Sequence, residues 1–146
     1  YYCDDEKSEE LWKGDWLHTG DVGMVDSEGY LRITDRIKDV IKSGGEWISS
    51  IELESLIMEI KGVEIAAVVG VPDEQWGERP CAWIQTHLDS IDLDAIQDHL
   101  KQYVEKGKLP SWAIPNLVAV VEEIPRTSVG KIDKKEIRKR ISQMGE

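Results

Sequence analysis

Apolar and polar positions along this chain alternate in a way that predicts several short strands. A β-hairpin is expected first, because apolar residues on either side of a glycine-containing turn, Asp26 to Gly29, recur at strand spacing. A nearly continuous apolar run then predicts a buried strand, and we expect Pro72 to end it. The hairpin and the three later strands are expected at residues 22–33, 63–71, 81–88 and 117–121.

Three further segments have the spacing of amphipathic helices. Ser49 and Glu52 form a capping box, and apolar residues follow at intervals of three and four until Gly62. The other two helices are expected at residues 92–105 and 133–141. Residues 1–16 are charged and lack a clean period, so we interpret them as a connector or as an extension of something upstream. Residues 35–42 are interpreted as a short linker or strand.

The order of these elements predicts the fold class. A β-hairpin followed by α-β-β-α-β-α indicates an α+β fold, in which a small antiparallel or mixed sheet of about three strands is flanked by helices. The 146 residues are enough for one ordinary domain with a core of its own.

Composition narrows the classes of partner. The chain has 18 Lys and Arg against 29 Asp and Glu, so its formal charge of −11 argues against nucleic acid or an anionic membrane as the main partner. No apolar run approaches the roughly 20 residues of a membrane helix, so no transmembrane segment is expected. Cys3 and Cys81 lie far apart without metal-ligand spacing. We therefore expect no metal site and reduced thiols in the cytoplasm.

Lys131 is the sharpest candidate for chemistry. It follows a polar loop bracketed by Pro125 and Gly130. An ammonium group on such a loop is a movable point charge that can meet negative charge developing on a carboxylate and a phosphate. A single lysine is more often a solvated surface residue. The loop is not a Walker phosphate loop, because Ile132 stands where Ser or Thr is required.

A second group of cations precedes a glycine pair. Arg36, Lys38 and Lys42 lie at i, i+2 and i+6, so in extended chain they share one face and could meet an anionic ligand. The spacing alone favours the polar face of an edge strand, balanced by Asp35 and Asp39.

The remaining candidates each allow two interpretations. Gly44 and Gly45 permit positive φ and close approach of another group, or simply form a tight turn. Asp21 could accept hydrogen bonds from ribose hydroxyls, or could cap its own turn. Trp47 and Trp76 could anchor the core or stack on a ligand.

Three segments in order carry a family resemblance: HTGD at 18–21, DRIKDVIKSGGEWISSIELE at 35–54 and PRTSVGK at 125–131. They resemble motifs in the C-terminal domain of the adenylate-forming superfamily, which includes acyl-CoA synthetases, firefly luciferase and the adenylation domains of peptide synthetases. The resemblance covers essentially the whole chain. The form KSGGEWISS is most similar to the branch that activates medium- and long-chain fatty acids.

The resemblance implies a reaction and a set of roles. In the family, a carboxylate and ATP form an acyl-adenylate and pyrophosphate, the small domain rotates, and the CoA thiol displaces AMP. Lys131 would then be the adenylation lysine, Asp21 would hold the ribose hydroxyls and Arg36 would contact the nucleotide. Lys38 falls at the hinge position whose torsions turn the domain.

The same resemblance implies roles for the glycine-pair segment in the thioester-forming pose. Lys42 would face the site, and Gly44 and Gly45 would lie beside the pantetheine channel. Many short-chain members have an arginine where Trp47 stands, so Trp47 is not assigned their phosphate-binding role. Our hypothesis is that its indole borders the acyl tunnel. ATP, CoA and Mg²⁺ are the implied cofactors, bound mainly by the large domain of the family.

That large domain carries a phosphate loop and an acyl pocket, and nothing here matches either. We therefore expect residues 1–34 to be the tail end of the large N-terminal domain, 35–42 the hinge region and 43–146 the mobile C-terminal domain. The implied partners are the missing large domain of the same polypeptide, a fatty acid and CoA, and the isolated chain is expected to be inactive. Two alternatives remain open: a non-catalytic binding module with this fold, and an adenylating enzyme whose acceptor is a carrier protein.

Overall fold

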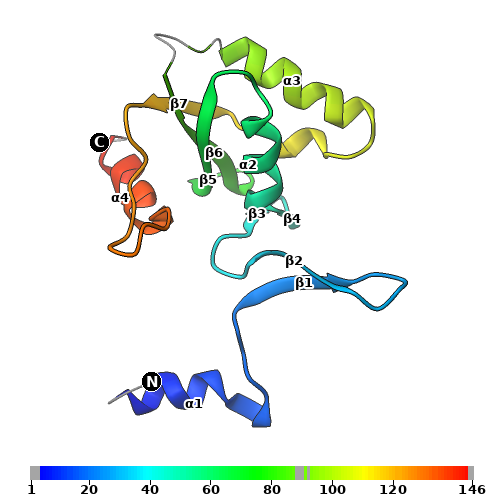
Figure 1. Ribbon diagram of the computed structural model, residues 1–146, viewed down its shortest axis with the longest axis vertical. Coiled ribbons are helices and arrows are strands. Elements are labelled where there is room, and N and C mark those ends of the chain that lie inside the picture. The colour runs from blue at the N-terminus through cyan, green and yellow to red at the C-terminus, as the bar shows by residue number, and fades with distance from the viewer. Residues whose placement is uncertain (1–3, 88–90, 92, 145–146) are drawn as a thin grey trace. The chain divides into compact units, whose positions relative to one another are not determined.

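The computed structural model describes residues 4–87, 91 and 93–144, and it divides into two compact units (Figure 1). The N-terminal unit comprises Tyr1–Lys38 and the C-terminal unit Asp39–Glu146.

The N-terminal unit consists of a short helix and a hairpin. Its elements are α1 (Asp5–Leu11), a 3₁₀ turn (Lys13–Asp15), β1 (Asp21–Val25) and β2 (Leu31–Arg36). The predicted hairpin is confirmed: β1 and β2 pair antiparallel, and Asp26 Oδ1 accepts hydrogen bonds at 2.9 Å from the backbone N–H groups of Glu28 and Tyr30. The sequence predicted no helix at α1, where Asp4 caps the first turn by accepting from Lys7 N at 3.1 Å.

The C-terminal unit is built on a five-stranded mixed sheet. Its strands are β3 (Ile41–Ser43), β4 (Glu46–Ile48), β5 (Val63–Asp73), β6 (Gly77–Thr86) and β7 (Leu117–Val121). Strand β6 pairs antiparallel with β5 and parallel with β7, and its first residue also pairs with β3. The α+β class is confirmed. The sheet has five strands and not about three, because β3 and β4 were not predicted. Each is only three residues long, too short to show a strand period.

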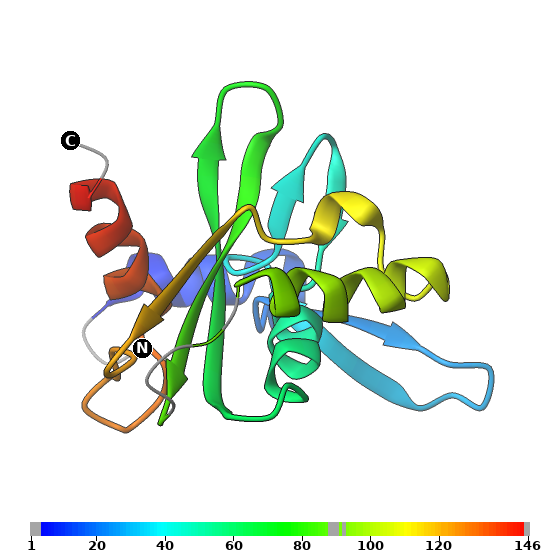
Figure 2. The same ribbon diagram turned by 90° about the horizontal axis from the view of Figure 1, so that it is seen from above.

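Helices cover both faces of this sheet (Figure 2). Helices α2 (Ser50–Met58) and α3 (Leu93–Glu105) lie on one face, and α4 (Lys134–Met144) lies on the other. Alternate residues of β5 and β6 therefore enter two different cores, which explains the continuous apolar run in the sequence. The core beneath α2 and α3 includes Ala66, Val68, Ala82 and Ile84, and the core beneath α4 includes Ala67, Val69, Cys81 and Trp83.

Two predicted strand ends are wrong. Strand β5 continues through Pro72, which pairs with Glu78, to Asp73. Proline is tolerated there because β5 pairs only with β6, so the missing N–H can face the open edge. Strand β6 also starts at Gly77 rather than at Cys81. Leu88 and Asp92, predicted strand and helix ends, lie outside the described residues.

Local signals in the C-terminal unit are confirmed more closely. Ser49 caps α2 by accepting from Glu52 N at 3.2 Å, and Leu53 and Ile57 are fully buried beneath that helix. Strand β7 has its predicted bounds. Within the described part of the chain, no helix combines the length and apolar character needed to cross a membrane. Cys81 is a buried free thiol, and its burial raises the pKa to about 11.

Candidate functional site

Lys131 lies on a small closed loop between β7 and α4. Thr127 N donates to Lys131 O at 2.7 Å, and Lys131 N donates to Thr127 Oγ1 at 3.2 Å. A single β-bridge between Arg126 and Ile132 closes the loop, and Gly130 supplies the positive φ of 81° that its turn needs. The Lys131 side chain is exposed, and among the described residues no hydrogen bond or ion pair holds its ammonium group. The backbone is thus fixed while the charge can still move.

Asp133 joins this loop to the helix that follows. Its N–H donates to Pro125 O at 2.8 Å, and its Oδ1 accepts from Glu136 N at 3.0 Å, as a helix N-cap does. The position of Lys131 is therefore coupled to the first turn of α4.

In the N-terminal unit, Asp21 and Arg36 face each other across the hairpin. They are register partners, and Arg36 Nε lies 3.3 Å from Asp21 Oδ1. Both line an open depression of about 800 Å³, together with Thr19 and Lys38. Its lining includes the Asp21 carboxylate, the cations of Arg36 and Lys38 and the Thr19 hydroxyl, which suits a ligand that carries both hydroxyl and anionic groups. Three further charged residues, Lys7, Glu10 and Lys13, also line it.

The prediction that Arg36, Lys38 and Lys42 share one face of an extended segment is wrong. Strand β2 ends at Arg36, and residues 37–40 form a turn before β3 begins. Lys38 is in that turn, and Lys42 belongs to a different strand. The extended conformation that the even spacing required is interrupted.

The glycine pair forms the turn of the β3–β4 hairpin. Gly44 and Gly45 have φ of 60° and 87°, the two positive values that a two-residue type I′ turn requires. Lys42 and Trp47 are register partners, and Lys42 Nζ lies 5.9 Å from the centre of the indole ring. Trp47 is mostly exposed, and Gly44 N donates to Trp76 O at 2.8 Å.

We expect Gly44→Ala to destabilise the C-terminal unit by about 2 kcal/mol and Gly45→Ala by about 1 kcal/mol. Both substitutions place a side chain at positive φ, but only at Gly44 would the new Cβ lie 2.9 Å from the Trp76 ring. At Gly45 no atom lies within 4 Å of that position. Urea unfolding of both variants measures the difference, and equal losses would contradict the packing argument.

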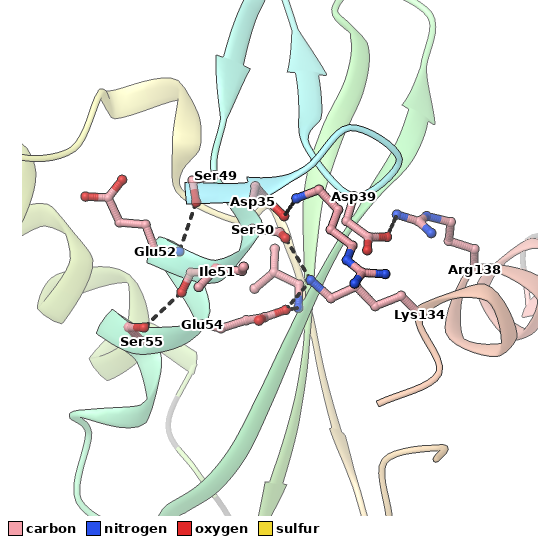
Figure 3. Close-up of polar contacts among 12 residues, drawn as sticks. Asp35, Asp39, Ser49, Ser50, Ile51, Glu52, Glu54, Ser55, Lys134 and Arg138 are labelled. Atoms are coloured by element: carbon pink, nitrogen blue, oxygen red, sulfur yellow. Dashed lines mark hydrogen bonds and ion pairs between the residues drawn. The ribbon is translucent and has the colours of Figure 1, made fainter. Parts of the chain in front are cut away.

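Two ion pairs that the sequence did not reveal fix α4 (Figure 3). Lys134 Nζ lies 2.7 Å from Glu54 Oε1, and Arg138 Nη2 lies 3.0 Å from Asp39 Oδ1. The available signal was the spacing of Lys134 and Arg138, four residues apart on one helix face. Their acidic partners are too distant in the sequence to be paired with them by inspection.

The structure brings together two pairs of predicted site residues, Asp21 with Arg36 and Lys42 with Trp47. Lys131 lies on a separate loop of the C-terminal unit. Across residues 4–87, 91 and 93–144, no three or more His, Cys, Asp and Glu side chains are grouped as metal ligands.

Comparison with known proteins identifies the family to which this chain belongs. A sequence profile of the AMP-binding enzyme C-terminal domain matches residues 52–131, more than half of the chain. The chain belongs to this family.

Individual relatives agree with that assignment. The chain is 40% identical over 146 residues to the peroxisomal trans-cinnamate:CoA ligase of Petunia hybrida, covering 99% of this chain and 25% of that protein. It is 40% identical over 139 residues to the long-chain-fatty-acid–CoA ligase of Thermus thermophilus, covering 94% of this chain and 25% of that one. The structure of ATP-bound MatB from Rhodopseudomonas palustris matches with a TM-score of 0.85 and 30% identity, over 100% of this chain and 28% of MatB. The chain spans about a quarter of the length of the curated relatives it matches.

Proposed function

We propose that this chain is the C-terminal part of an AMP-forming acyl-CoA synthetase, which joins a fatty acid to CoA through an acyl-adenylate. The observation that carries the proposal is the exposed ammonium group of Lys131 on a fixed loop, in a chain that belongs to the AMP-binding family. CoA ligases among the relatives, one of them acting on long-chain fatty acids, support the substrate class.

In the adenylation step, Lys131 neutralises negative charge on the acid and on the phosphate it attacks. Asp21 accepts hydrogen bonds from the ribose hydroxyls, and Arg36 contacts the nucleotide. The residues fit this ligand because Asp21 and Arg36 line one open depression. ATP supplies the phosphoanhydride that is cleaved, and Mg²⁺ would be held mainly by the large domain.

The proposed domain boundaries are 1–34 for the tail end of the large domain, 35–42 for the hinge region and 43–146 for the mobile domain. The division into two compact units after Lys38 supports a hinge at that residue. In the thioester-forming pose Lys42, Gly44 and Gly45 would face CoA, and Trp47 would border the acyl tunnel. The type I′ turn supports the role of Gly45, because no atom lies within 4 Å of a Cβ built there and the backbone is open to a ligand, whereas the Trp76 ring packs against Gly44.

The proposed partner is the large domain of the same polypeptide. Five apolar residues of the β1–β2 hairpin are each more than half exposed, which is typical of a surface that another domain covers. They are Met24, Val25, Tyr30, Leu31 and Ile33. We place the protein in the cytoplasm, on the support of the free thiol of Cys81. The peroxisomal relative names the compartment to test against it.

The proposal is tested with the full-length polypeptide that contains this chain. We expect it to catalyse fatty-acid-dependent exchange between ATP and labelled pyrophosphate, and the 146-residue chain alone to show none. CoA and a phosphopantetheinyl carrier protein are then offered side by side as acceptors. Failure of exchange with every fatty acid would favour a non-catalytic binding module, and transfer to the carrier alone would replace CoA as the acceptor.

We expect Asp21→Asn to raise the KM for ATP about tenfold in the full-length enzyme, because an amide offers the ribose hydroxyls one oxygen acceptor and no charge. Asp26→Asn in the same hairpin is the control, since asparagine also forms this turn. Steady-state kinetics with varied ATP measures both. An unchanged KM in Asp21→Asn would remove this residue from the nucleotide site.

A further inference from the structure

We propose that Lys134 is a positioning residue for Lys131. Its buried ion pair with Glu54 fixes the start of α4 and, through it, the loop that delivers the adenylation lysine. This inference rests on the proposed function.

The ion pair joins three elements at one carboxylate oxygen (Figure 3). Lys134 Nζ lies 2.7 Å from Glu54 Oε1 and donates to Ser50 Oγ, also at 2.7 Å. The same Glu54 oxygen accepts from Val68 N at 2.8 Å. The Lys134 and Glu54 side chains are only 13% and 12% exposed, so water competes little for these contacts. Helix α4 is thereby fixed to α2 and to β5 at its first residue.

A second contact one turn later prevents α4 from pivoting about this point. Ile137 is fully buried in the core beneath α4, and Arg138 pairs with Asp39 at 3.0 Å. Residues 134, 137 and 138 lie on one face of the helix, so α4 is fixed at both ends of its first turn. Asp39 directly follows Lys38, the proposed hinge. A rotation at the hinge would therefore carry α4 with it as part of one rigid body.

Lys131 is only three residues before Lys134, and the chain between them has little freedom. Asp133 bonds both to Pro125 O and to the first turn of α4, and Thr127 closes the loop around Lys131. A displacement of the start of α4 must therefore displace the lysine loop. Misplacing a catalytic group by about 1 Å can cost about 100-fold in rate.

Stability alone does not explain this arrangement. Desolvating two charges largely cancels their attraction, so apolar residues of similar size often stabilise a protein as well as a buried ion pair does. What the pair adds is a defined geometry. Lys135 and Lys139 on the same helix are exposed and provide matched lysines outside the network.

The test uses the full-length enzyme with Glu54→Gln and Lys134→Met combined. The amide oxygen introduced by Glu54→Gln can still accept from Val68 N, and methionine fills the volume of the lysine stem. We expect kcat for adenylation to fall about 10- to 100-fold while the KM values for ATP and fatty acid stay within about threefold. The second half-reaction, started from synthetic acyl-adenylate and CoA, is expected to stay within about threefold of the parent. Lys134→Arg with the native Glu54 can keep the ion pair, so its adenylation rate should stay close to that of the parent. Lys135→Met should leave both half-reactions unchanged.

Equal loss of both half-reactions, or adenylation within about threefold of the parent, would overturn the inference. If the double variant does not fold, Glu54→Gln combined with Lys134→Gln, which leaves no buried charge unpaired, is measured in the same two assays with the same criteria. Lys131→Ala is measured in parallel. If Lys131→Ala retains adenylation, the proposed function itself fails. If it loses adenylation while the Lys134 variants keep it, only the positioning role is wrong.

Discussion

Replacing Lys131 by alanine is expected to lower the adenylation rate of the full-length enzyme by about 100- to 1,000-fold, the range seen when one preorganised electrostatic group is removed from a reaction centre. The side chain is exposed and, in the described part of the chain, holds no ion pair, so its loss should change the free energy of unfolding by less than about 0.5 kcal/mol. The second half-reaction, started from synthetic acyl-adenylate, should be nearly unchanged. A large and selective loss of rate at unchanged stability is the signature of a catalytic residue.

Pre-steady-state measurement of pyrophosphate release separates the two half-reactions. Lys135→Ala, also an exposed lysine close in the sequence, is the control and should behave like the parent. Lys131→Arg keeps the charge but changes its shape and reach, so we expect an intermediate rate. Adenylation within about threefold of the parent in Lys131→Ala would contradict the assignment.

Ile57→Ala is expected to destabilise the C-terminal unit by about 2–5 kcal/mol. Ile57 is fully buried beneath α2, in the core that includes Leu53, Val68 and Ile84. Truncation removes three methyl or methylene groups from a close-packed interior and leaves a cavity that α2 and β5 can fill only in part.

Ile51→Ala provides a matched control for that prediction. It makes the same change on the same helix, where Ile51 is 44% exposed, so the gain in helix propensity cancels between the two variants. We expect a loss below about 1 kcal/mol there. Urea unfolding followed by tryptophan fluorescence measures both, since Trp83 is buried in the sheet. Equal losses would show that the packing beneath α2 is not what stabilises the unit.

The elements that the sequence predicted well are those with strong local causes. Strand β7 and the cap of α2 depend on an apolar run and on a serine followed by a glutamate, which act over a few residues. Strands β3 and β4 were not predicted, because three residues cannot show a period and because their register depends on the turn at Gly44 and Gly45. The end expected at Pro72 failed because only the sheet order shows that β5 is an edge strand.

The candidate site also has features that the local sequence predicts and features that depend on tertiary packing. The loop of Lys131 was predicted because proline, glycine and a lysine are adjacent in the sequence. The ion pairs of Lys134 and Arg138 were not, because nothing local says which of the chain's 29 acidic residues will face a given cation. Glu54 becomes the partner of Lys134 only after α2 and α4 have packed around β5.

The buried thiol of Cys81 can report how often the core beneath α4 opens. Because burial raises the pKa of Cys81 to about 11, the fraction of the side chain present as thiolate near neutral pH is about 100-fold lower than for a cysteine with the ordinary pKa of 9.0. Alkylating reagents attack the thiolate, and burial in the middle of β6 also blocks their approach. In a chain with Cys3→Ser, the rate of pulsed labelling by iodoacetamide therefore reports how often the core between α4 and the sheet opens, independently of motions within residues 1–38.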